Sequence, residues 1–254
     1  MRIIAAVPNW NMGSSLIPLL ASLSAESLDG IYVLDDASED GSPGQVETTF
    51  PDVVVVRGDH NAGAAGNRNR ILPFLTGKEV IIFLDADMEL KTHNLRKAVR
   101  GSFSIPYTGI VGGLILNADG DAMEWNYGFA MTKDNRDAAL ADAYSGRRQV
   151  DWVAEGLFAV RSDVFRKVDG YDTRFRYHEG QDLGLRVKQA GYDVVFDPRI
   201  CARHLEIDVR GAARSREWSE GRRLFYAKHP GTGPDVKRLS VADRSDDAAH
   251  GDDL

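Results

Sequence analysis

Asp85 and Asp87, one residue apart, are the side chains whose types and spacing most directly indicate chemistry in this sequence. They follow the apolar run VIIFL at 80–84, which predicts a strand buried on both faces. Two carboxylates at the end of such a strand repel each other and are costly to remove from water. A divalent cation such as Mg²⁺ or Mn²⁺ takes oxygen ligands and relieves that repulsion. The pattern therefore favours a metal-bound ligand at this strand end, and a solvated loop with two aspartates is the alternative.

Length, charge and cysteine content limit the class of protein. The chain has 254 residues and a formal net charge of −7, which suits a globular fold and does not suit general nucleic-acid binding. The single cysteine, Cys201, leaves no intrachain disulfide and fits a reducing compartment. No apolar run approaches the roughly 18 residues of a transmembrane helix, and the N-terminus lacks a signal-peptide pattern. We expect a cytoplasmic protein with at most peripheral membrane contact.

Four predicted strands position the polar residues. Apolar runs at 2–7, 30–34, 52–57 and 80–84 alternate with helical patterns at 14–24 and from 61 onward. This alternation predicts an α/β fold with βαβ units, whose right-handed crossovers bring the loops after the parallel strands to one edge. Ligands of open α/β sheets bind at that edge. The segments expected to converge there are 8–11, 35–36, 61–70 and 85–87.

The pattern changes after about residue 90. Strands are expected at 109–116, 150–160 and 192–196, helices at 91–103, 161–167 and 179–190, and a hairpin or meander at 121–132. No linker separates this half from the first, so we expect one domain. Residues 236–254 are acidic and carry no apolar cluster, which predicts a disordered tail.

The residues of the expected edge resemble the family 2 glycosyltransferases of the GT-A fold, especially their rhamnosyltransferase-like members. The matching segments come in the family's order over about residues 1–210: VPNWN, LDDASEDGS, NAGAAGNRN, FLDAD, GYDTRF with GQDLGLR, and the late His204. The resemblance implies a Rossmann-like, mostly parallel sheet flanked by helices, with a smaller mixed acceptor-side subregion. It assigns 1–116 to nucleotide-sugar binding and 117–235 to the acceptor and the catalytic base.

The resemblance also implies a nucleoside-diphosphate sugar donor, held with Mn²⁺ or Mg²⁺. Asp87 would be the direct metal ligand, and His204 would complete the metal site, where an imidazole suits Mn²⁺ better. Trp10 would stack on the base and Asp36 would accept a hydrogen bond from it, which favours UDP or dTDP over GDP. The donor-binding residues implied together are Pro8, Trp10, Asp36, Asn61, Gly63, Asn67, Arg68 and Asp85, with Arg70 as the alternative to Arg68 at phosphate.

The acceptor side would carry the general base. In the family this base is the aspartate of a Glu-Asp pair at the start of a helix, and the pair here reads Gln181 and Asp182. Asp182 is therefore implied as the base, while Glu179, two residues earlier, leaves the register open. Without an enzyme nucleophile, the reaction would invert the anomeric carbon. The sugar and acceptor pocket is implied at Trp125, Trp152, Glu155, Gly156 and Gln181, for a glycan, protein or small-molecule acceptor.

Other classes of protein fit the sequence less well. A catalytically silent nucleotide-sugar-binding scaffold would keep the fold, and Gln181 leaves this alternative open. A sugar-1-phosphate nucleotidylyltransferase would carry a Gly-rich loop with Arg and Lys after the first strand, and PNWNMG is a poor match. A dinucleotide dehydrogenase is disfavoured because G-x-G-x-x-G is absent after the first strand.

The segment 209–229 is basic and amphipathic. It would serve as a lid over the diphosphate, as a peripheral contact with a lipid-linked acceptor, or as a helix packed on the core with a solvated basic face. The packed helix is the favoured interpretation, because runs of charge are usually solvated.

Overall fold

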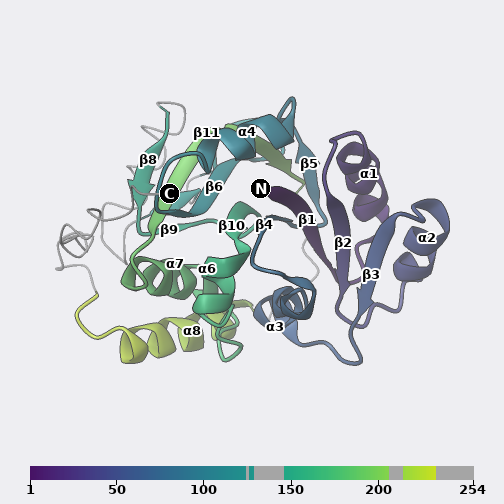
Figure 1. Ribbon diagram of the computed structural model, residues 1–254. Coiled ribbons are helices and arrows are strands. Elements are labelled where there is room, and N and C mark those ends of the chain that lie inside the picture. The colour runs from purple at the N-terminus through teal and green to yellow at the C-terminus, as the bar shows by residue number, and fades with distance from the viewer. Residues whose placement is uncertain (124–125, 129–145, 206–213, 233–254) are drawn as a thin grey trace.

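A large mixed β-sheet forms the centre of the computed structural model, which describes residues 1–123, 126–128, 146–205 and 214–232 (Figure 1). The strands are β1 (Arg2–Asn9), β2 (Gly30–Asp35), β3 (Val53–Arg57), β4 (Glu79–Leu84), β5 (Met88–Leu90), β6 (Thr108–Leu116), β7 (Tyr127–Gly128), β8 (Arg148–Val150), β9 (Trp152–Val153), β10 (Leu157–Arg161) and β11 (Asp193–His204). Within the described residues the sheet runs β3-β2-β1-β4-β10-β6-β11-β5, with β8 beside β11. β7 and β9 pair separately.

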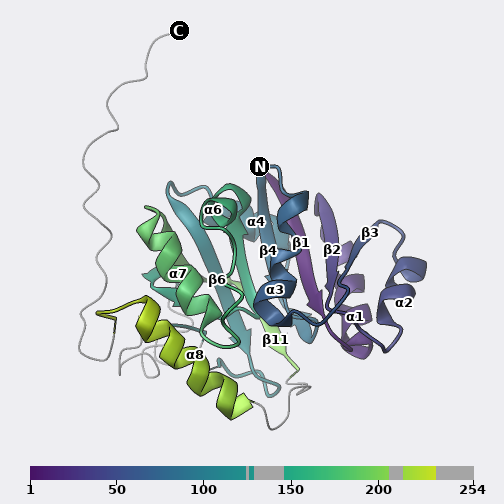
Figure 2. The ribbon, with the colours of Figure 1, turned by 90° about the horizontal axis from the view of Figure 1, so that it is seen from below.

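Helices cover both faces of this sheet (Figure 2). They are α1 (Gly13–Ser24), α2 (Ser42–Thr49), α3 (Gly63–Asn69), α4 (Leu95–Ser102), α6 (Ser162–Lys167), α7 (Glu179–Gln189) and α8 (Arg214–Lys228), with a 3₁₀ helix η1 (Leu72–Phe74). Apolar side chains of α1, α2 and α4 join one face of the sheet in one core cluster. Those of α3, α6 and α7 join the opposite face in a second cluster. The sheet is thus the middle layer of three.

β4 is buried on both faces, as the sequence predicts. Its side chains alternate, so that Ile82 and Leu84 lie in one core cluster. Ile81 and Phe83 lie in the other. Because β1 and β10 flank β4 in the sheet, Asp85 emerges from the centre of the sheet.

The parallel arrangement expected for the first half is confirmed. β1 pairs in parallel with both β2 and β4, and β2 pairs in parallel with β3. Asn9 at the end of β1 lies opposite Asp35 at the end of β2, so the two strands end at the same level. β10 then runs antiparallel between β4 and β6 and unites both halves of the chain in one sheet.

Several element boundaries differ from those expected. β1 continues through Pro8, because its pairing with β4 already ends at Ala6 and proline breaks no ladder hydrogen bond on that side. The strand expected at 150–160 is divided into β8, β9 and β10. α4 begins only at Leu95, where the Asn94 side chain caps its first turn.

β5 is a short strand that the sequence did not predict. It pairs antiparallel with the far end of β11, which is longer than the expected strand at 192–196. Half of the expected meander at 121–132 and all of the tail at 236–254 lie outside the described residues. In the described parts of the chain, no helix is long and apolar enough to cross a membrane.

Candidate functional site

A buried polar contact joins the ends of β1 and β2. Nδ2 of Asn9 donates to Oδ1 of Asp35 at 2.9 Å and to Oγ of Ser42 at 2.9 Å. The backbone N–H of Ser38 donates to Oδ2 of Asp35 at 3.2 Å. Asp35 therefore holds the loop after β2 in place, which is a structural role.

Asp36 holds the N-terminus of α3 at the same edge. Its carboxylate oxygens accept the backbone N–H groups of Ala62 at 2.8 Å and Gly63 at 2.9 Å. Oδ1 of Asn61 accepts the same Gly63 N–H at 3.1 Å. Gly63 has a φ of +75°, a conformation that favours glycine. The structure thus brings Asp36, Asn61 and Gly63 together, and their contact with a nucleotide stays a prediction.

Pro8 and Trp10 stand at the end of β1 and are both partly exposed. Pro8 lies opposite Leu34 of β2, so the two strands fix its position. A partly exposed aromatic ring at this edge can stack on a base whatever its identity. The stacking expected of Trp10 stays a prediction.

Asn67 and Arg68 lie beneath the edge, and they contact the protein itself. Nδ2 of Asn67 donates to the carbonyl oxygen of Leu34 at 2.7 Å, which docks α3 on β2. Arg68 is 3% exposed, and its Nη2 donates to Oδ1 of Asp85 at 2.6 Å. Burial lowers the pKa of Arg68, but the charge of Asp85, with smaller contributions from its neighbours, outweighs burial and raises it. Arg68 thus orients Asp85, a different task from the expected contact with the donor.

Asp87 and His204 lie side by side. The pairing of β5 with β11 places His204 opposite Met88, next to Asp87. Oδ2 of Asp87 is 3.4 Å from Nε2 of His204. Neighbouring ligands at about 2.1 Å from one ion stand roughly 3 Å apart, so the pair fits a divalent cation with one carboxylate and one imidazole ligand. Because no group of three or more His, Cys, Asp or Glu in the described residues is arranged for a metal, donor oxygens or water would complete the coordination.

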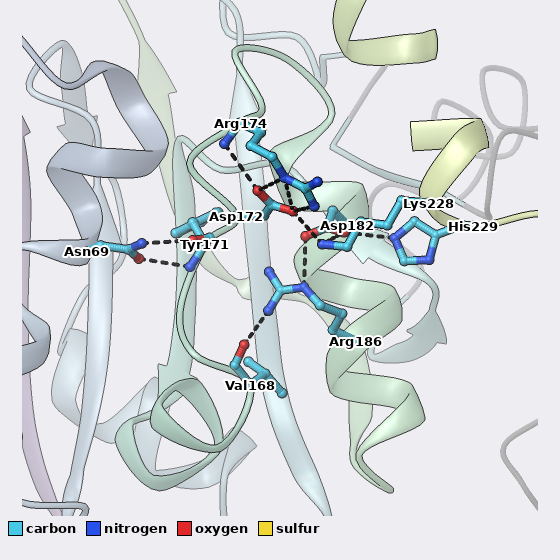
Figure 3. A network of polar contacts seen from close by, with 9 residues as sticks. All are labelled: Asn69, Val168, Tyr171, Asp172, Arg174, Asp182, Arg186, Lys228 and His229. Carbon is cyan, nitrogen blue, oxygen red and sulfur yellow. Dashed lines mark hydrogen bonds and ion pairs between the residues drawn. The ribbon is translucent and has the colours of Figure 1, made fainter. Parts of the chain in front are cut away.

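Asp182 belongs to a closed ion network between α7 and α8 (Figure 3). Its Oδ2 accepts from Nε of Arg186 at 2.8 Å. Its Oδ1 is 2.8 Å from Nε2 of His229 and 2.7 Å from Nζ of Lys228. Lys228 also lies 2.8 Å from Oδ2 of Asp172, which extends the network to the loop before α7.

The surroundings of Asp182 do not suit the base that the sequence implies there. The residue is 0% exposed, and both carboxylate oxygens are engaged. Burial raises the pKa of Asp182, but the hydrogen bond with His229 and the charges of Arg186 and Lys228 outweigh burial and lower it. A base must reach the acceptor hydroxyl and hold its proton, whereas this carboxylate is enclosed and its ionised form is stabilised.

α8 is the packed helix that the sequence favoured for the basic segment, over the part at 214–228 that the structure describes. Phe225 is fully buried and clusters with Phe175 and Leu185. The carbonyl oxygen of Tyr177 lies so close to Gly221 of α8 that any larger side chain there would collide with it. Trp218 is 42% exposed, so one side of the helix faces solvent.

The acceptor pocket implied by the resemblance is only partly assembled. Trp152 is 8% exposed, and its ring packs on Gly128, where a Cβ atom would collide with it. It is a core residue, and the expectation that it contacts a sugar is not supported. Gln181 is partly exposed on α7, while Trp125 lies outside the described residues.

Glu155 and Gly156, in contrast, reach the edge. The carbonyl oxygen of Gly156 accepts the backbone N–H of Asp85 at 3.0 Å. The carbonyl oxygen of Glu155 lies 3.5 Å from Nη2 of Arg68. The neighbouring Tyr171 was missed by the sequence analysis, because only its folded position links it to this cluster.

Comparison with known proteins places these residues in a family. Residues 5–168, more than half of the chain, match the sequence profile described as Glycosyl transferase family 2. The N-acetylglucosaminyl-diphospho-decaprenol L-rhamnosyltransferase of Mycobacterium tuberculosis is 26% identical over 218 residues, covering 74% of this chain and 71% of that protein. These matches confirm the resemblance seen in the sequence.

Solved structures of glycosyltransferases share the fold. The mannosyltransferase PcManGT from Pyrobaculum calidifontis, in complex with GDP-Man and Mn²⁺, superposes with a TM-score of 0.67 at 18% identity, covering 94% of this chain and 66% of that one. S. aureus TarS 1-349 in complex with UDP-GlcNAc gives 0.66 at 15% identity, covering 90% and 66%. The chain thus spans about two thirds of these longer structures. It belongs to glycosyl transferase family 2, and it is a GT-A-type glycosyltransferase that transfers a sugar from a nucleotide-sugar donor.

Proposed function

We propose that this glycosyltransferase inverts the anomeric carbon and depends on a divalent metal, with Mn²⁺ ahead of Mg²⁺. The observation that carries the proposal is the contact of 3.4 Å between Asp87 and His204 at the edge of the sheet. The structure of PcManGT contains GDP-Man and Mn²⁺. GalNAc-T7, which superposes with a TM-score of 0.64 at 18% identity, was solved with UDP, GalNAc and Mn²⁺. Those complexes support a metal in this fold, and UDP or dTDP stays our preferred nucleotide because of Trp10 and Asp36.

Asp87 and His204 would hold the metal, and the bound ion would offset the charge that develops on the leaving diphosphate. An acceptor hydroxyl attacks the anomeric carbon while the bond from that carbon to the phosphate oxygen breaks. The hydroxyl proton passes to a carboxylate of the protein, and the electron pair of the broken bond leaves with the nucleoside diphosphate. A single displacement of this kind inverts the anomeric configuration.

A glycan is the acceptor that the comparisons support best. The Mycobacterium tuberculosis relative is named for rhamnosyl transfer to an N-acetylglucosaminyl-diphospho-decaprenol. By analogy, we propose a saccharide acceptor for this chain and place protein and small-molecule acceptors behind it. A rhamnosyl or other deoxyhexosyl donor is the first to test.

A silent nucleotide-sugar-binding scaffold is the second candidate. The observation that favours it is the closed network around Asp182, the residue that the resemblance implies as the base. A scaffold would bind the donor without consuming it.

The test is donor turnover. The full-length protein is incubated with UDP-, dTDP- and GDP-sugars, free glycan acceptors and Mn²⁺, and released nucleoside diphosphate is measured with and without EDTA. We expect release from one class of donor, lost with EDTA, and NMR of the product should show inverted anomeric configuration. Retained configuration or release in EDTA would contradict the proposal, and binding without release would establish the scaffold.

A further inference from the structure

The loop between α6 and α7, residues 168–178, lies along α3. At the last residue of α3, Nδ2 of Asn69 donates to the carbonyl oxygen of Tyr171 at 2.8 Å, and the backbone N–H of Tyr171 donates to Oδ1 of Asn69 at 2.8 Å (Figure 3). At the first residue of α3, a Cβ atom on Gly63 would come within 2.8 Å of Cζ of Arg176. The Arg176 guanidinium thus occupies the space that a side chain at position 63 would take.

Arg176 carries a charge that the protein leaves free. Its side chain is exposed, and among the described residues its guanidinium has no hydrogen-bond or ion-pair partner. Arg174, two residues earlier, is also exposed but pairs with Asp172 at 2.6 Å. Nη2 of Arg70 donates to Oδ1 of Asp36 at 3.1 Å. Of these three arginines, only Arg176 keeps all its N–H groups available to a ligand.

Contacts between neighbouring loops place Arg176 beside the residues expected to bind the base of the donor. The backbone N–H of Asp36 donates to the carbonyl oxygen of Asn9 at 2.9 Å, which fixes Asp36 beside the end of β1, where Trp10 follows. Oδ2 of Asp36 accepts the backbone N–H of Gly63 at 2.9 Å, and Gly63 in turn contacts Arg176. An aromatic ring, a carboxylate and a guanidinium therefore follow one another along the edge of the sheet.

These three groups suit the recognition of a particular kind of base. An indole offers a stacking surface, a carboxylate accepts from a base N–H, and a guanidinium donates to a carbonyl oxygen. Uracil, thymine and guanine each carry a ring N–H beside a carbonyl oxygen, whereas cytosine and adenine carry an amino group in place of that carbonyl. Because an amino group and a guanidinium are both hydrogen-bond donors, the guanidinium favours the first three bases.

We propose that Arg176 is a specificity-determining residue of the donor site, and that its guanidinium donates to a carbonyl oxygen of the nucleobase. The proposal rests on the proposed function and adds a second base contact to the one expected of Asp36. Because Arg176 belongs to the loop before α7, the second half of the chain contributes to recognition of the donor, which the sequence assigned to residues 1–116.

Nucleotides that differ in this carbonyl or amino group test the proposal. Isothermal calorimetry compares UDP and dTDP with CDP, and GDP with ADP, each with Mn²⁺, for the unaltered protein and three variants. Arg176→Met removes the donors and keeps a long side chain, and Arg176→Lys keeps the charge. Arg174→Met, the matched control, removes the same charge from an exposed arginine of the same loop that pairs with Asp172. Melting curves report the fold.

We expect the unaltered protein to bind UDP, dTDP or GDP at least about 10-fold more tightly than the amino counterpart, CDP or ADP. Arg176→Met should weaken binding of that nucleotide by about 10-fold, because one hydrogen bond from a charged donor is lost. Its binding of the amino counterpart should stay within twofold. Arg176→Lys should lose less affinity than Arg176→Met, because an ammonium group also donates. Arg174→Met should bind every nucleotide as the unaltered protein does.

Three results would overturn the proposal. Equal weakening of a nucleotide and its amino counterpart in folded Arg176→Met would move the contact to the ribose or the phosphates, which the two share. Unchanged binding in Arg176→Met would leave Arg176 as a solvated surface residue. Both of these results leave the proposed function standing. An unaltered protein that binds none of the five nucleotides would remove the proposed function together with the role of Arg176.

Discussion

The end of β4 and the start of α7 both carry aspartates in loops or first turns, yet the two regions treat them differently. Asp87 stands beside an imidazole that can itself ligate a metal. Asp182 is surrounded by Arg186, Lys228 and His229 of its own chain. One carboxylate lies beside an imidazole at the edge of the sheet, and the other is neutralised within the fold.

The two regions show what determines whether a buried acidic side chain has a structural role or a ligand-binding role. Removing a charge from water is offset by counter-charges of the chain or by a ligand. At α7 the chain itself supplies the counter-charges, and the resulting ion pairs hold α7 and α8 together. At the edge of the sheet the chain places Asp87 beside His204, and there we propose that a bound ion offsets the charge. The assignment of chemistry therefore depends on the neighbours more than on the residue type.

The largest effect should follow from removing the negative charge of Asp87, which lies beside His204. Asp87→Asn keeps the shape of the side chain but removes the carboxylate, so we expect Mn²⁺-dependent turnover of donor to fall by at least about 10²-fold. Steady-state release of nucleoside diphosphate at several Mn²⁺ concentrations measures this. If Asp87→Asn keeps full activity at low Mn²⁺, Asp87 does not hold the metal.

A large loss of stability should follow from the same change at α7. Asp182→Asn leaves Arg186, Lys228 and His229 without their shared anion, and breaking a buried ion pair from one side costs roughly 3–5 kcal/mol. For a domain of this size we expect the melting temperature to fall by roughly 10 °C. Glu220→Gln, which alters the exposed pair with Arg216 on α8, is the matched control and should melt as the unaltered protein does. Equal melting of the two variants would contradict the structural role of Asp182.

The sequence predicted the edge of the sheet more reliably than the α7–α8 joint. Apolar runs followed by polar residues are local signals, and they were sufficient to bring 35–36, 61–70 and 85–87 together. Lys228, the last residue of α8, and His229, directly after it, lie 46 and 47 residues after Asp182, and no local pattern indicates which helix meets α7. β5 is three residues long and pairs with residues more than a hundred positions away. Its position could therefore not be predicted from the sequence.

The smallest effect concerns acid stability. The pKa of Asp182 is lowered in the folded protein, and so is that of Asp172, through Arg174 and then Lys228. A carboxyl group with a lowered folded pKa contributes stability above its unfolded pKa of about 3.9 and loses it as pH falls through the folded value. We expect the free energy of unfolding to decrease below about pH 4, with a shallower slope in Asp182→Asn. Urea unfolding at several pH values would show it, and parallel slopes would argue against the network.

Isothermal calorimetry of UDP, dTDP and GDP, with and without Mn²⁺, tests the central claim most directly when it is run on the unaltered protein, Asp87→Asn and Asp182→Asn. We predict Mn²⁺-dependent binding of one nucleotide to the unaltered protein, loss of the metal dependence in Asp87→Asn at an unchanged melting temperature, and retention of it in the less stable Asp182→Asn. Metal-dependent binding that survives in Asp87→Asn and disappears in folded Asp182→Asn would contradict the division of roles between the two regions.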